Sequence, residues 1–243
     1  SQVTAEDFFQ TRQQFTSALG DAYNPLTDFG ASVGPSTPAE VMTDEVIVPG
    51  RAQDWSEGGF WARKHAHEWN IDDGAWSSVW QSFFTGVNNA NRLIFQIEQA
   101  VEEGAADEEL ATQFLAELRS MRAFYYFWLL DNYGNVPILT SFEDAPENPT
   151  QPCSEGPVAS QQCFQDGRQE VFNFVEQQLL DNIDALSEDK QATYGRMNKW
   201  VAHMTLAKLY MMSEHYTGTA RWDDALTHLN AIINSGQYSL ASD

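Results

Sequence analysis

The stretch that decides the fold is residues 115–139, LAELRSMRAFYYFWLLDNYGNVPIL, in which positions 124–128 are five consecutive aromatic residues. Apolar residues recur at helical spacing and occupy most of the circumference of a helix. A helix of this kind must be packed on several sides. Gly134 suits the left-handed position after a helix, and Pro137 prevents its continuation. We therefore predict a helix over residues 107–132 that lies inside a stack of helices.

The rest of the chain is also predicted to be mostly helical. The last two predicted helices carry small residues where they would cross, as a tetratricopeptide-type helix pair requires. The sequence thus predicts an all-α, tetratricopeptide-like scaffold, a single domain over residues 1–243, with long irregular loops at 24–74 and 140–166. The other helices are predicted at 4–19, with Thr4 and Asp7 as a capping box, and at 75–103, 169–186, 197–213 and 221–235.

The chain is strongly acidic, with 13 basic and 35 acidic residues, a net charge of −22 and a pI near 4.3. Phosphates would be repelled, so nucleic acid is excluded as a partner. An acidic surface with few lysines is typical of proteins adapted to concentrated salt, although an acidic protein from an ordinary habitat fits as well. The sequence as given contains no apolar run of about 18 residues and begins with a polar segment. We expect that any targeting segment has been removed.

The two cysteines, Cys153 and Cys163, flank a stretch that contains proline and glycine. Zinc sites of the common type use closer pairs and further nearby ligands, which are absent around them. A short disulfide-closed loop formed in an oxidising compartment is the favoured interpretation, and two free thiols are the alternative.

One pattern hints at metal chemistry. His65 and His67 have a spacing found at metal sites on strands, but no further histidine cluster supports it. The sequence contains no nucleophile elbow, dinucleotide fingerprint, phosphate loop or zinc-protease motif. We therefore predict no cofactor and no enzyme activity.

Sugar binding is better supported, because it needs aromatic faces together with polar groups for the hydroxyls. The irregular segment supplies both, although its rings also suit a cap on the helical core. The predicted ligand-binding residues are Trp55, Phe60, Trp61, Arg51 and Asp54, with Gln53, Arg63 and His65 near them. The remaining tryptophans considered, Trp69, Trp76, Trp80, Trp128 and Trp200, are assigned to the core.

Four stretches together resemble the SusD/RagB family of surface glycan-binding lipoproteins of Gram-negative bacteria. They are FFQTRQQFTSALGDAYNPL, WQSFFTGVNNANRLI, AELRSMRAFYYFWLLDNYGNVPIL, and GRMNKWVAHMTLAKLYM followed by WDDALTHLNAIINSGQYSL. The third is the most specific. By this resemblance the family's structural positions are taken by Glu117, Arg122, Ala123, Tyr133, Gly134, Val136 and Pro137.

The resemblance implies capture of oligosaccharide at the outer cell surface beside a SusC-like TonB-dependent outer-membrane transporter. Family members are longer, so we expect an N-terminal portion that lacks the signal, the lipid-bearing cysteine and the C-terminal half. An exposed apolar patch is then expected near Leu226, Leu229 and Ile233. Three alternatives stay open: a relative that captures peptide, a scaffold without ligand, and a metal-dependent hydrolase using His65 and His67.

The acidic composition predicts that the melting temperature rises with salt well beyond the concentration at which ordinary screening saturates, because self-repulsion at −22 opposes compaction. Thermal melts between dilute buffer and molar salt measure this. A flat melting temperature would remove the interpretation as salt adaptation.

We also expect Cys153 and Cys163 to be joined, with a loop-closure stabilisation of about 2–3 kcal/mol. Thiol titration of the unfolded, unreduced protein should find no reactive group. Two titratable thiols would contradict the disulfide.

Overall fold

The computed structural model describes residues 9–29, 36–51, 54–55, 57–69, 74–143 and 161–241. Within these ranges every regular element is a helix, so the predicted all-α class is confirmed. None of the described helices is long and apolar enough to span a membrane.

Contacts within the chain define two compact units, which we describe separately. The first comprises residues 1–22 and 87–243, and the second comprises residues 23–86. The first unit is built from α1 (Arg12–Tyr23), the later part of α4 (Gly74–Glu102), α5 (Glu108–Tyr133), α6 (Gln161–Asn182), α7 (Lys199–Met211), α8 (Ser213–Thr217) and α9 (Trp222–Asn234), with a 3₁₀ turn at Ile183–Ala185. The second contains α2 (Ser36–Val41), α3 (Phe60–His65), the beginning of α4, and 3₁₀ turns at Asn24–Asp28 and Glu57–Gly59.

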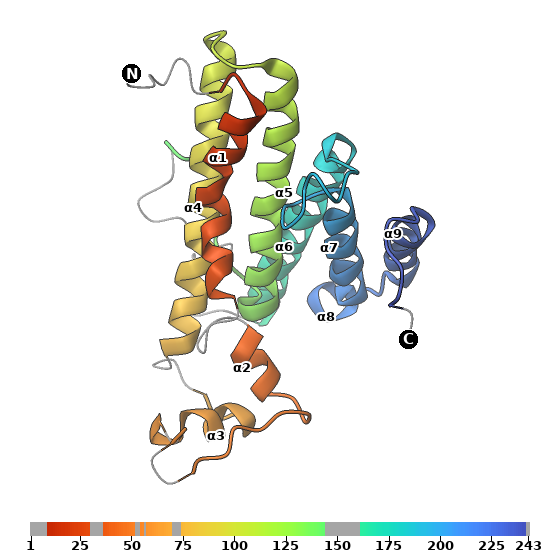
Figure 1. Ribbon diagram of the computed structural model, residues 1–243. Coiled ribbons are helices and arrows are strands. Elements are labelled where there is room, and N and C mark those ends of the chain that lie inside the picture. The colour runs from red at the N-terminus through yellow and green to blue at the C-terminus, as the bar shows by residue number, and fades with distance from the viewer. Residues whose placement is uncertain are drawn as a thin grey trace. The chain divides into compact units, whose positions relative to one another are not determined.

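In the first unit α1, α4 and α5 lie side by side, and the chain then continues through α6 and α7 to α9 (Figure 1). Helix α5 packs against α6, and α7 packs against α9. The α7–α9 pair has the predicted small residues, and Ala202, Ala207 and Ala225 are all buried. This succession of helix pairs agrees with a tetratricopeptide-like arrangement.

Helix α5 is the predicted interior helix. The Asp107 side chain caps it by accepting a hydrogen bond from the Leu110 backbone N–H at 2.8 Å, and Gly134 ends it with φ 73°. Tyr125 and Tyr126 are fully buried, and each has a partner for its hydroxyl. The Tyr125 hydroxyl donates to the Ala22 carbonyl at 2.6 Å. The Tyr126 hydroxyl accepts from the Leu139 backbone N–H at 2.6 Å.

Two arginines, one buried and one half-buried, fix α5 to its neighbours. The Arg122 guanidinium, 5% exposed, donates to the Asn91 side chain at 2.7 Å and to the Gln178 side chain at 2.5 Å. It also donates to the Thr140 carbonyl at 3.1 Å. Burial lowers the pKa of Arg122 to about 10, so the group stays charged at neutral pH.

The second arginine, Arg196, binds the Glu117 carboxylate through both oxygens, at 2.9 and 2.5 Å. Glu117 is 5% exposed, so this is an ion pair inside the fold. Most of the positions to which the family resemblance gives a structural role are buried in the fold. They are Glu117, Arg122, Ala123, Gly134, Val136 and Pro137.

Helix α1 begins at Arg12, not at residue 4 as predicted, because residues 9–11 form a turn and bend. Its capping box consists of Thr11 and Gln14. The Gln14 backbone N–H donates to the Thr11 hydroxyl at 3.3 Å, and the Thr11 N–H donates to the Gln14 side chain at 2.8 Å. Thr4 and Asp7 lie outside the described residues.

Helix α6 begins at Gln161, eight residues before the predicted start at Gln169, so the backbone of Cys163 is helical. Cys153 and the Cys163 side chain lie outside what the structure describes, and the disulfide stays a prediction. The exposed patch expected on α9 is confirmed at Leu226 and Ile233, which are 54% and 68% exposed, whereas Leu229 is half-buried.

The Arg122 contacts predict that Arg122→Met lowers the free energy of unfolding by about 2–4 kcal/mol. The substitution leaves the buried Asn91 amide and the half-buried Gln178 amide without this partner. Urea denaturation monitored by circular dichroism measures the change. Arg119→Met is the matched control, because Arg119 lies on the same helix in a more exposed ion pair with Glu98 and should cost less than about 1 kcal/mol. Equal losses in both variants would contradict the assignment.

Candidate functional site

The predicted ligand-binding residues all lie in the second unit, where the backbone is unusual just before α3. Trp55, Glu57, Gly58 and Gly59 have φ values of 57°, 34°, 63° and 82°. A left-handed conformation costs a residue with a side chain about 1–2 kcal/mol. Two such residues in one short segment are the kind of strain that collects at binding sites.

The strained segment places Trp55 at the surface, with 58% of the residue exposed. Its side chain borders a hollow of about 510 Å³ that is also lined by Arg51 and Asp54. Arg51 and Asp54 exchange two backbone hydrogen bonds, at 2.9 and 2.8 Å, and thereby close a tight turn. The other lining residues are Ile47, Val48 and Pro49. The structure therefore brings three of the five predicted residues to one hollow.

The other two predicted residues, Phe60 and Trp61, lie in the interior of this unit. Trp61 is only 2% exposed, so its faces are not available to a ligand as predicted. Phe60 is half-buried and contacts the Trp61 ring edge-on, at 4.9 Å between centroids. The fully buried Lys64 lies over both Phe60 and Trp76, with its Nζ 5.0 and 5.1 Å from the ring centroids.

His65 and His67, which were considered as an alternative metal pair, both contact backbone carbonyls. The His65 Nδ1 lies 3.1 Å from the Val41 carbonyl, and the His67 Nε2 lies 2.9 Å from the Met42 carbonyl. Since a carbonyl oxygen only accepts, each ring donates and ties the end of α3 to the end of α2. Among the described residues no group of three or more metal-binding side chains is found.

Five tryptophans were assigned to the core. Three of them are half-buried rather than buried, and the assignment of one is wrong. Trp69 is 42% exposed, because the chain leaves α3 through the left-handed His67 and Trp69 falls in the turn rather than on a helix face. Trp200 is buried as predicted. The half-buried rings are Trp76, Trp80 and Trp128.

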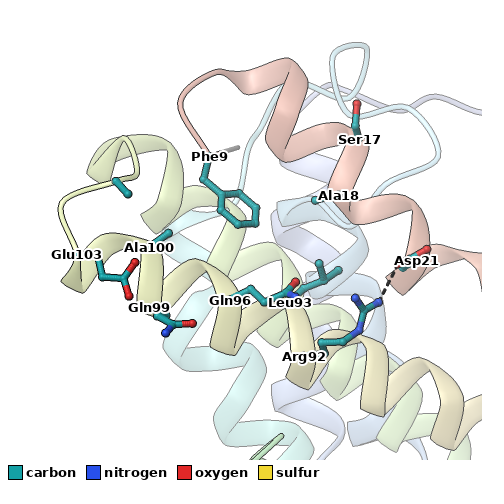
Figure 2. Close-up of a pocket in the computed structure, with 11 residues that line it drawn as sticks. Phe9, Ser17, Ala18, Asp21, Arg92, Leu93, Gln96, Gln99, Ala100 and Glu103 are labelled. Carbon is teal, nitrogen blue, oxygen red and sulfur yellow. Dashed lines mark hydrogen bonds and ion pairs between the residues drawn. The ribbon is translucent and has the colours of Figure 1, made fainter. Parts of the chain in front are cut away.

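A second hollow lies in the first unit, between α1 and α4, and has a volume of about 500 Å³. Figure 2 shows Arg92 paired with Asp21, Gln96 and Gln99 further along α4, and Glu103 just after its end. The Arg92–Asp21 ion pair is 2.8 Å long. The remaining lining residues include Phe9, Ala18, Leu93 and Ala100, which form an apolar floor. The site offers hydrogen-bonding groups, but the one ring among its described lining residues is buried.

A third hollow, of about 390 Å³, lies beside α5 and α7. It is mainly aromatic, and Lys208 is its one charged residue among those described. Trp200 lines this hollow, and its indole N–H donates a hydrogen bond to the Glu188 carbonyl at 2.9 Å. Such a surface suits apolar groups better than sugar hydroxyls. Its aromatic residues are Phe124, Phe127, Trp128, Trp200 and Tyr238.

A family profile described as starch-binding and associating with the outer membrane matches residues 10–211. The chain belongs to this SusD-like family. A SusD-like protein of Bacteroides ovatus is 31% identical over 135 residues, which cover 56% of this chain and 22% of that protein. The starch-binding protein SusD of Bacteroides thetaiotaomicron is 26% identical over 141 residues, which cover 58% and 22%.

The fold agrees with this family. The crystal structure of a SusD homologue from Bacteroides thetaiotaomicron matches with a TM-score of 0.77 and 22% identity, over 100% of this chain and 44% of that one. The aligned stretches cover 22% of each of these two curated relatives, and the chain covers less than half of the length of that crystal structure. The family description names binding and no reaction.

Proposed function

We propose that this SusD-like chain belongs to a non-enzymatic receptor that captures oligosaccharide at the outer cell surface and passes it to a SusC-like TonB-dependent transporter. The family description supports both the ligand class and the association with the outer membrane. The resemblance to starch-binding SusD makes an α-glucan the first ligand to test. A lipid anchor would attach the receptor to the membrane.

The observation that carries this proposal is the exposed ring of Trp55 beside Arg51 and Asp54. An exposed indole offers an apolar face for the C–H side of a pyranose ring. The guanidinium and the carboxylate supply a donor and an acceptor for the hydroxyls. The volume of about 510 Å³ is within the usual range for small-ligand sites. Phe60 and Trp61 would support this platform from the interior of the unit.

The alternatives are distinguished by the ligand. A peptide-capturing relative would bind peptide and ignore glycans, and a scaffold without ligand would bind neither. A hydrolase would need His65 and His67 to hold a metal, and among the described residues they belong to no group of three or more potential metal ligands. Incubation with maltoheptaose followed by chromatography should leave the sugar intact. Shortened products would favour the hydrolase.

We predict that Trp55→Ala weakens binding of the glycan about 5- to 100-fold, because removal of one stacked ring costs about 1–3 kcal/mol. Calorimetry of the purified protein with maltoheptaose, or with the best glycan from an array, measures the affinity. Arg51→Gln and Asp54→Asn should each weaken binding by removing one charged hydrogen-bonding group.

Trp222→Ala is the matched control, because Trp222 is 52% exposed, close to the 58% of Trp55, and lies on α9 in the other unit. It should bind as the unchanged protein does. Arg92→Gln tests the hollow of Figure 2 in the same assay. If Arg92→Gln weakens binding and folded Trp55→Ala does not, the glycan site lies between α1 and α4 and the Trp55 platform is wrong.

A further inference from the structure

Two histidines from neighbouring helices face each other in the first unit. His203 of α7 and His228 of α9 have their Nδ1 atoms 2.8 Å apart and their ring centroids 5.0 Å apart. Since the line between the rings runs through both nitrogens, this is a hydrogen bond in which one Nδ1 donates and the other accepts. The two rings must therefore hold opposite tautomers when both are neutral.

The geometry favours a shared proton over a shared metal ion. Two imidazoles on a tetrahedral metal at about 2.0–2.1 Å hold their nitrogens about 3.4 Å apart, and their lone pairs converge at an angle. These nitrogens are closer and point at each other. Within the described residues they also form no group of three or more potential metal ligands.

The histidine pair lies in the contact between α7 and α9. Helix α9 packs on α7, and Ala225 is its one fully buried residue among those described. The His228 ring stacks on Tyr210 of α7, with centroids 5.5 Å apart and planes at 21°. The His203 ring stacks on Trp200, with centroids 6.1 Å apart and planes at 24°. These ring contacts therefore add to the apolar packing that holds α9 on α7.

Charges from several elements surround the pair. Around His203, burial lowers the pKa to about 4, with smaller lowering effects from His228 and Lys199 and an opposing effect from Asp184. Around His228, burial also lowers the pKa, Arg221 lowers it further, and Asp224 and Glu176 oppose this. Both rings are therefore neutral at neutral pH.

The hydrogen bond can accommodate one added proton but not two. A first proton on a remote Nε2 leaves one Nδ1–H facing one lone pair. A second proton puts two N–H groups and two positive charges against each other at 2.8 Å. We propose that His203 and His228 form an acid-sensitive latch that holds α9 on α7 when at most one ring is protonated and releases it when both are.

The direction of the pH dependence follows from the lowered pKa values. A released histidine titrates near 6.5, whereas His203 in the folded latch titrates near 4. Between these values the released state binds more protons, so the latch loses stability as the pH falls. The stabilisation is complete above about pH 6.5 and is lost progressively toward about pH 4.

The latch predicts that α9 opens locally in acid before the rest of the unit does. Hydrogen exchange followed by mass spectrometry, corrected for intrinsic exchange, should show protection of α9 falling about tenfold or more between about pH 7 and pH 5. Protection of α5 should change less. In long-range ¹H–¹⁵N spectra at neutral pH, one ring should be the Nδ1–H tautomer and the other the Nε2–H tautomer.

Variants separate the latch from a general effect of acid. His203→Gln and His228→Gln should each reduce the pH dependence of α9 protection, because one titrating partner is gone, and the double variant should remove most of it. His215→Gln is the matched control, since His215 is an exposed histidine on α8, and it should keep the pH dependence of the unchanged protein. Titration of both rings near pH 6.5, or α9 protection that does not change between about pH 7 and pH 5, would overturn the proposal.

Discussion

The buried guanidinium of Arg122 is the constraint on which the first unit depends. A charge in the interior is tolerated only if it is well hydrogen-bonded, and here the partners of the two terminal nitrogens of Arg122 come from α4, α6 and the segment after α5. One side chain therefore fixes the positions of these three elements relative to one another. The Glu117–Arg196 pair adds the same kind of constraint between α5 and the segment before α7. Helices held in fixed positions in this way can support the loops that connect them.

The helices that sequence analysis predicted well are those with the strongest apolar periodicity. Helices α4 and α5 differ from their predicted bounds by a residue at most, because their pattern and their caps agree. Helix α1 was predicted too early, since Thr4 and Thr11 both precede an acceptor three residues later and the pattern alone does not choose between them. The prediction that Trp69 lies in the core was wrong, because the residues that follow α3 decide its exposure and its spacing in the sequence does not.

The candidate site was predictable in part. Aromatic and charged residues in an irregular segment pointed to Arg51, Asp54 and Trp55, but the sequence could not tell that Trp61, six residues after Trp55, turns inward. The histidine pair was not predicted, because its two members are 25 residues apart in the sequence and no local motif joins them. A signal did exist: His203 and His228 lie at comparable distances from the segment between α7 and α9, which contains α8, and packed antiparallel helices bring such positions together.

The burial of Lys64 between aromatic rings has a practical consequence for chemical labelling. The chain has four lysines, and Lys64 is the one within residues 23–86. Because its amine is fully shielded, reagents that acylate amines will spare this unit while it is folded and modify Lys190, Lys199 and Lys208, which lie in the other unit. Acylation of Lys64 therefore measures how often residues 23–86, the unit that contains Trp55, open transiently.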